Sequence, residues 1–172
     1  MGETRMDAAL SKLLDLHEIG QVLATYPIAI DTRRPELLDR SFAAEAQLHL
    51  DGVGALDLEK YKEMCRTVLP TLDATQHHLG QPAIRIEGDR AFSRCYFVAQ
   101  HVRNALAPRP ALLVGGWYDD ELARAAGGWR IQRRRGSAVW YDGNPDVLGY
   151  AFPMGASPRG PGHEAPAWLR MG

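Results

Sequence analysis

"TQHHLGQPAIRIEGDRAFSRCYFVAQH", which runs from Thr75 to His101, is the stretch that decides the fold. Polar and apolar residues alternate through it and Gly88-Asp89 divides it, which is the pattern of two half-buried strands joined in a hairpin. The stretch also holds three of the six histidines of the chain. We therefore expect a sheet that carries ionisable side chains on a partly buried face.

The sequence on the C-terminal side of this hairpin continues in the same pattern. "ALLVGGWYDDELARA" and "WRIQRRRGSAVWY" predict a third and a fourth strand, joined across Gly127-Gly128. The strands follow one another with short turns, which is typical of an antiparallel meander.

The sequence on the N-terminal side is mainly helical. A first helix, kinked by Pro27 near its last turn, is predicted by an apolar stripe at helical spacing: Leu16, Ile19, Leu23, Tyr26 and Ile30. Pro35 suits the first turn of a short second helix and Asp57 the N-cap of a third, with a strand at "AQLHLDG" between them. Helices followed by a meander predict an α+β fold.

The composition excludes several classes of function. The chain has 172 residues and 45% hydrophobic content, enough for one domain with its own core. Its formal net charge of −1 gives no overall field that would attract nucleic acid or an anionic membrane. No apolar run approaches the roughly 18 residues of a membrane helix and no signal-peptide core is present, so we expect a cytoplasmic protein.

The C-terminal region differs in composition from the rest. We expect residues 1–141 to form the domain and residues 142–172 to form a Gly- and Pro-rich tail. Because this tail also carries Tyr150, Phe152 and Trp168, we expect it to dock on the domain as a candidate lid.

Four side chains are candidates for acid–base chemistry. Asp31 follows the apolar stripe at the C-terminal end of the first helix, where the helix dipole disfavours a carboxylate. It is either a turn residue facing water or a buried carboxylate that orients a histidine. His77 and His78 point to opposite faces of one strand, so one of them at most faces a given cavity. His101 follows an apolar strand face, and Tyr26 lies on the helix stripe, where it is either a core residue or a donor to substrate.

Metal and cofactor sites are not predicted. Asp31, His77 and His101 could in principle form a two-histidine, one-carboxylate metal site, but they lie in no local ligand motif. The sequence also lacks a phosphate-binding P-loop, a dinucleotide-binding GxGxxG and a GxSxG nucleophile elbow. Cys65 and Cys95 sit in no metal spacing and read as free core thiols.

The order of these segments resembles the SnoaL-like branch of the nuclear-transport-factor-two-like superfamily. The resemblance covers Leu13 to Tyr141 and rests on seven pieces in sequence: "YPIAID", "PELLDRSF", "AEAQLHLDG", "TQHHLG", "IRIEGDRAFSRCYFVAQH", "GGWYDDELAR" and "GGWRIQRR". It implies a cone-shaped α+β barrel, with a curved antiparallel sheet wrapped around the N-terminal helices and an apolar pocket inside. It also implies a homo-oligomer, either a dimer or a trimer.

Within this superfamily the chain is most similar to scytalone dehydratase and to related dehydratases and dehydrochlorinases. The resemblance implies catalytic roles for Asp31, for His77 in "TQH" and for His101 in "AQH", and Tyr26 matches a tyrosine of the bile-acid dehydratases. Scytalone dehydratase also uses two tyrosines whose places are taken here by Ile30 and Leu50. Scytalone itself is therefore not the expected substrate.

We accordingly expect a cofactor-independent lyase, similar to a dehydratase, that acts on a small apolar cyclic substrate such as a polyketide, a steroid or an aromatic catabolite. His77 would be the base, Asp31 its partner, and His101 or Tyr26 a donor. Five aromatic residues are expected to line the pocket: Phe97, Trp117, Tyr118, Trp129 and Trp140. The alternatives are a non-catalytic binding or assembly module of the same fold, and a polyketide cyclase, an isomerase or an epoxide hydrolase.

Overall fold

The computed structural model describes residues 2–149 and 166–170. Its α-helices are α1 (Gly2–Asp31), α2 (Leu58–Val68) and α3 (Ala167–Arg170). Its strands are β1 (Phe42–Leu50), β2 (Gly54–Asp57), β3 (Ala74–Leu79), β4 (Ala83–Glu87), β5 (Arg90–Val102), β6 (Ala111–Ala125) and β7 (Gly128–Gly143). Short 3-10 helices are η1 (Pro35–Arg40), η2 (Leu69–Thr71), η3 (Asn104–Leu106) and η4 (Pro145–Val147).

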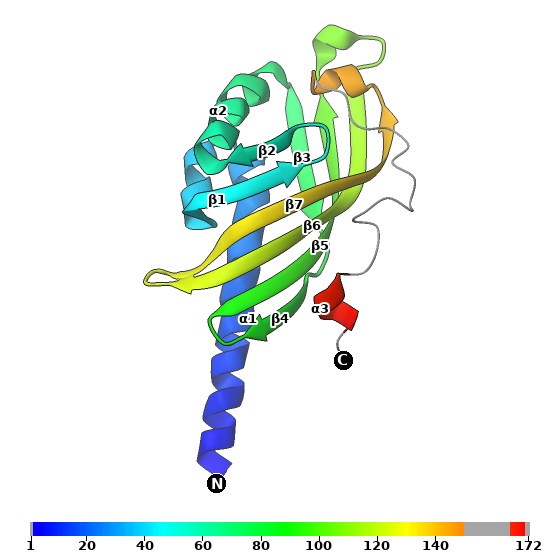
Figure 1. Cartoon of the computed structure of the whole chain (residues 1–172). Helices are drawn as coiled ribbons and strands as arrows, with labels where there is room; N and C mark the ends of the chain where they lie inside the picture. The colour runs from blue at the N-terminus through cyan, green and yellow to red at the C-terminus, as the bar shows by residue number, and fades with distance from the viewer. Residues whose placement is uncertain (1, 150–165, 171–172) are drawn as a thin grey trace.

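The strands form one curved sheet with the order β2-β1-β7-β6-β5-β3, and β4 pairs with β5 beside β3. All described pairings are antiparallel except β1 with β7, which is parallel. Figure 1 shows the sheet curving across α1, with α2 over one end and the N-terminal turns of α1 projecting beyond the sheet. The α+β class and the curved sheet around N-terminal helices are thus confirmed.

The predicted hairpins form, but their first strand is divided. β4 pairs with β5 around a turn at Gly88, which has a φ of 61°, and β6 pairs with β7 around Gly128, which has a φ of 97°. The stretch from Thr75 to Gly88 is two strands instead of the one predicted. β3 ends at Leu79 and β4 begins at Ala83. Pro82 lies between them, and it lacks the N–H that a continuous ladder needs.

The core lies between the concave face of the sheet and the stripe of α1. Ile19, Leu23, Tyr26 and Ile30 of this stripe are buried, as the helical spacing predicts. On β5 the alternate residues Cys95, Phe97, Ala99 and His101 are buried while the residues between them are exposed. The concave face therefore carries the side chains of odd number in this part of β5.

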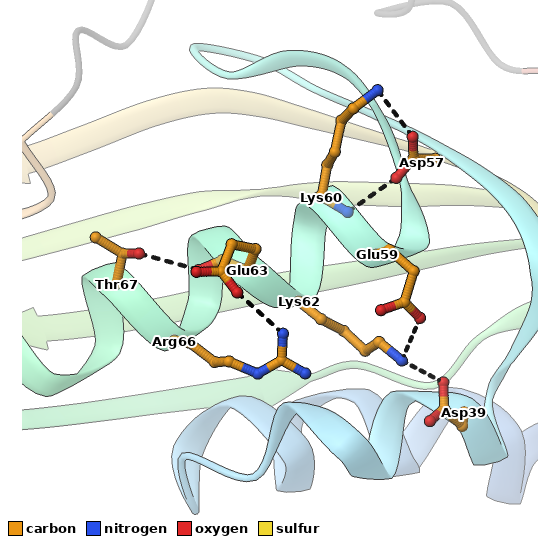
Figure 2. A network of polar contacts seen from close by, with 8 residues as sticks. All are labelled: Asp39, Asp57, Glu59, Lys60, Lys62, Glu63, Arg66 and Thr67. Atoms are coloured by element: carbon orange, nitrogen blue, oxygen red, sulfur yellow. Dashed lines mark hydrogen bonds and ion pairs between the residues drawn. The ribbon is translucent and has the colours of Figure 1, made fainter.

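Helix α2 is held in place by polar contacts of its N-terminal half. Asp57 caps the helix by accepting a hydrogen bond from the Lys60 N–H at 2.8 Å. The Lys62 ammonium, 7% exposed, bridges Asp39 of η1 and Glu59 at 2.8 and 2.6 Å. Figure 2 shows the Lys60–Asp57 contact on one side of the helix and the contacts of Lys62 with Glu59 and Asp39 on another. The side of α2 that faces the sheet carries Tyr61 and Cys65, which are both buried.

The residues after β7 begin by packing on the domain. In η4, Val147 is fully buried, and Leu148 follows it into the core. In α3, the Trp168 ring stacks on Phe92 of β5, and Arg85 of β4 donates a hydrogen bond to the Trp168 carbonyl at 2.8 Å. The rest of the predicted lid, including Tyr150 and Phe152, lies outside the described residues. No helix among the described residues is long and apolar enough to cross a membrane.

Candidate active site

The end of α1 places Asp31 at the rim of the sheet. The helix closes with a paired bonding pattern in which the Arg34 N–H donates to Ala29 at 2.8 Å and the Arg33 N–H donates to Ile30 at 3.0 Å. This closure needs a left-handed residue, and Arg33 supplies it with a φ of 57°. The helix therefore stops directly after Asp31. The helix dipole disfavours a negative charge at this end, so the Asp31 carboxylate needs hydrogen-bond donors from outside the helix.

His77 supplies two such donors, one from its backbone and one from its ring. It lies on β3, an edge strand of the sheet, and the outward backbone N–H groups of an edge strand lack a neighbouring strand. Asp31 accepts the His77 N–H through Oδ2 at 2.8 Å and contacts the His77 Nδ1 through Oδ1 at 2.8 Å. Because a carboxylate only accepts, Nδ1 carries a proton, and in the neutral form of the ring the lone pair is on Nε2. The His77 side chain is 7% exposed and lines the cavity, whereas His78 is exposed on the other face.

His101 lies beside His77 on the neighbouring strand. The two imidazole rings are 5.3 Å apart and nearly perpendicular. The His101 Nδ1 is 2.9 Å from the Thr75 hydroxyl oxygen. Burial, followed by the proximity of His77, lowers the pKa of His101 to about 3. His101 is therefore a neutral imidazole at physiological pH.

Three tyrosines form the wall across from these histidines. The hydroxyl groups of Tyr26 and Tyr61 are 2.7 Å apart, and the Tyr26 ring is 5.2 Å from that of Tyr118. Burial raises the pKa of Tyr26 and of Tyr61, so both phenols keep their protons. The Arg134 guanidinium lies 4.4 Å from the ring centres of both Tyr26 and Tyr118, and Asp120 binds it through two oxygens at 2.7 and 2.8 Å.

The space between these walls is a mainly apolar cavity of about 110 Å³. Its polar lining consists of Asp51, His77, His101 and the three tyrosines. Its apolar lining includes residues of α1, α2, β5 and β6, and the residue Leu148: Ile30, Met64, Val68, Phe97, Ala99, Val114 and Leu148. Burial raises the pKa of Cys65, which also lines the cavity, to about 11. Cys65 is therefore a thiol at neutral pH and is poorly suited to act as a nucleophile.

The structure brings together most of the residues expected at the site. Asp31 bonds to His77, which lies beside His101, and the Tyr26 ring is 6.1 Å from the His77 ring. Among the aromatic residues, Phe97 and Tyr118 line the cavity. Their rings stack at 4.5 Å. Among the described residues, no group of three or more His, Cys, Asp or Glu side chains is arranged to hold a metal ion.

The three tryptophans expected in the lining lie elsewhere. Trp117 pairs with Tyr96 in the register of β5 and β6, on the outer face of the sheet, because successive residues of a strand point to opposite faces. Trp140 is 45% exposed and borders the same outer-face groove as Trp117. Trp129 is fully buried, and its indole N–H donates to Asp15 of α1 at 3.0 Å. These three residues are not part of the cavity.

Three residues of the site escaped the sequence analysis: Thr75, Tyr61 and Arg134. Thr75 lies two residues before His77, and in a strand this spacing puts both on one face, so alternation was a usable signal. Tyr61 is one of several apolar positions on α2, and its rotation toward the cavity depends on how the helix packs. Arg134 belongs to the basic run "RIQRRRG", a composition typical of a solvated strand face, yet its side chain is 1% exposed and pairs with Asp120.

Comparison with known proteins finds relatives by sequence and by fold. The chain is 36% identical over 128 residues to an uncharacterised protein of Mycobacterium tuberculosis, covering 73% of this chain and 86% of that protein. A proposed scytalone dehydratase from Novosphingobium aromaticivorans has a TM-score of 0.72 at 21% identity, with 86% of this chain and 97% of that chain covered.

A hexachlorocyclohexane dehydrochlorinase, LinA-type3 from Novosphingobium barchaimii, has a TM-score of 0.70 at 15% identity, with 81% of this chain and 96% of that chain covered. At these identities the two solved structures show a shared fold. The SnoaL-like domain family matches residues 11–135, which is most of the chain. The chain therefore belongs to the SnoaL-like domain family.

Proposed function

We propose that this protein is a cofactor-independent lyase that removes water from a small cyclic β-hydroxy ketone by acid–base catalysis. The observation that carries the proposal is the Asp31–His77 pair at the wall of an apolar cavity, with 2.8 Å between Oδ1 and Nδ1. A carboxylate that takes the Nδ1–H of a histidine orients the ring and stabilises the imidazolium that forms when Nε2 accepts a proton.

The first step is removal of a proton from the carbon next to the carbonyl group. The His77 Nε2 takes this proton, and the electron pair of the broken C–H bond moves onto the carbonyl oxygen. Tyr26 and Tyr61 are protonated phenols at the cavity wall, and whichever hydroxyl accepts the bond between them is suited to donate its own proton to this developing enolate oxygen. The Arg134 guanidinium, which is paired with Asp120, packs 4.4 Å from the Tyr26 ring centre and helps to hold that ring in place.

The second step expels the hydroxyl group from the β carbon. The electron pair returns from the enolate oxygen, a carbon–carbon double bond forms, and the carbon–oxygen bond breaks. The departing hydroxyl takes the proton held on the His77 Nε2 and leaves as water, which returns His77 to its neutral state. The net reaction is loss of one water molecule. General acid–base catalysis of this kind contributes about 10²–10⁴ in rate.

The size of the cavity favours a substrate with one ring. An engineered apolar cavity of about 150 Å³ binds benzene, and the cavity here, about 110 Å³, is of similar size. A single six-membered ring with a ketone and a hydroxyl group therefore fits the proposal better than a steroid. The structural neighbours include a proposed scytalone dehydratase and a hexachlorocyclohexane dehydrochlorinase, and both names describe elimination reactions.

The proposal is tested by following the conjugated enone that elimination creates. Cyclic β-hydroxy ketones are incubated with the full chain and the ultraviolet absorbance is recorded. His77→Gln should abolish turnover, whereas His78→Gln should not, because His78 is the adjacent histidine on the exposed face. Binding of these ketones without elimination, at equal affinity in the wild type and His77→Gln, would instead assign a binding module.

A further inference from the structure

We propose, building on the function above, that Thr75 is a positioning residue that fixes the tautomer of His101. In this arrangement the Thr75 hydroxyl donates to the His101 Nδ1, and His101 presents an Nε2–H donor to the cavity. His77 presents a lone pair to the same cavity. The site would thus combine a proton acceptor and a neutral hydrogen-bond donor on adjacent strands.

The register of the sheet places the two side chains together. Thr75 on β3 and His101 on β5 are direct partners in the antiparallel ladder, and His77 is paired with Ala99 two positions along. Directly opposed residues point to the same face with their Cβ atoms about 4.5–5.5 Å apart. The distance of 2.9 Å between the Thr75 Oγ1 and the His101 Nδ1 follows from this pairing.

The direction of this hydrogen bond follows from counting donors and acceptors. A threonine hydroxyl has one proton, and a neutral imidazole has one N–H and one lone pair. Among the described residues, the His101 Nδ1 is the one hydrogen-bond partner of the Thr75 hydroxyl. If Nδ1–H were the donor, the hydroxyl proton would have no protein acceptor in this part-buried position. If the hydroxyl donates, its proton and the Nδ1 lone pair are both satisfied.

The surroundings of His101 keep it in a single neutral state. The ring is 6% exposed and lies 5.3 Å from the His77 ring, which disfavours a second positive charge when His77 takes up a proton. Since Nδ1 is occupied by Thr75, the proton resides on Nε2. The two histidines therefore have opposite Nε2 roles, because Asp31 fixes one tautomer and Thr75 fixes the other.

This pairing suits an elimination. A substrate in the cavity that both rings line would meet a base at its C–H bond and an N–H donor at its leaving or carbonyl oxygen. A donor that stays neutral does not compete with His77 for the proton that is transferred. Removal of the Thr75 hydroxyl should therefore weaken the chemical step more than substrate binding.

Nitrogen-15 NMR of histidine-labelled protein at neutral pH tests the tautomer without any substrate. The variants are Thr75→Val, which removes the hydroxyl, and Thr75→Ser, which retains it. Thr67→Val is the control, since the exposed Thr67 hydroxyl donates to the Glu63 carbonyl of its own helix. His101→Gln assigns the signals. We expect the wild type and Thr75→Ser to show the Nε2–H tautomer with a hydrogen-bonded Nδ1, and Thr75→Val to move the Nδ1 signal to the higher frequency of an unbonded nitrogen.

Two results would overturn the proposal: an Nδ1–H tautomer in the wild type, or an unchanged Nδ1 signal in a folded Thr75→Val. Thr75→Ala serves as the second variant if Thr75→Val does not fold. On a ketone that the wild type converts, Thr75→Val should lower kcat about tenfold with little change in KM, the size expected for one lost hydrogen bond, and Thr75→Ser should restore it. The tautomer and the elimination are read out separately, so either can fail while the other holds.

Discussion

Acidification tests the buried state of His101 without requiring a substrate. The pKa of His101 is about 3 in the folded protein, because of burial and the nearby His77, whereas the ordinary value is 6.5. Between these values the unfolded chain binds a proton at this position and the folded protein does not. Since the unfolded state binds more protons, the free energy of unfolding must fall as the pH is lowered from 6.5 toward 3.

The expected loss follows from the two pKa values. At about pH 7 the unfolded imidazole is mostly neutral, and at about pH 4.5 it is almost fully protonated while the folded one remains neutral. Each pH unit in this window contributes about 1.4 kcal/mol, so His101 alone should remove about 2.5 kcal/mol of stability between the two conditions. This is a large part of the stability of a typical domain, which is about 5–15 kcal/mol.

Urea unfolding at these two pH values measures the loss. The wild type is compared with His101→Gln, which lacks the titrating group, and with His78→Gln, whose histidine is exposed on the opposite face of β3. We expect the drop in unfolding free energy to be about 2.5 kcal/mol smaller in His101→Gln than in the wild type, and unchanged in His78→Gln. Equal drops in all three proteins would show that His101 titrates normally, and would refute the buried neutral donor.

Two further predictions concern the groups around His77 and Tyr26. Asp31→Asn should fold but lose about 10²–10⁴ in kcat, because an amide NH₂ facing Nδ1 favours the wrong His77 tautomer. Asp73→Asn is the control and should keep full activity in the same assay, because the Asp73 carboxylate accepts the Asn104 N–H, away from His77. Tyr61→Phe should cost about 1–3 kcal/mol in urea unfolding, because the buried Tyr26 hydroxyl loses its partner at 2.7 Å, and an unchanged midpoint would contradict the hydrogen bond.

Local patterns were sufficient to predict most of the strands and the starts of the second and third helices. Alternation between Cys95 and His101 gave the buried face of β5, and adjacency placed His77 and His78 on opposite faces, as the structure has them. The same rule could have excluded Trp117 from the cavity, since Tyr118 beside it points inward. The predicted meeting of Asp31 with His77 came instead from family resemblance, because residues 46 apart in sequence share no local pattern.

The remaining features depend on tertiary structure. The parallel pairing of β1 with β7 and the bulge between Gly115 and Gly116 set which side chains face each other across strands, and no local pattern encodes either one. Thr75 and His101 are 26 residues apart in sequence, and their contact depends on the register between β3 and β5. Charged residues are seldom buried, and the burial of Arg134 depends on Asp120 across the β6–β7 hairpin.

The central claim is that the His77 Nε2 removes a proton from carbon, and deuterium exchange measures that step directly. A cyclic ketone is incubated with the protein in deuterium oxide, and proton NMR follows loss of the signal from the carbon next to the carbonyl. The account predicts exchange catalysed by the wild type and by His78→Gln, and at least a hundredfold slower exchange by His77→Gln. Exchange at an equal rate in His77→Gln, or no catalysed exchange of any bound ketone by the wild type, would contradict it.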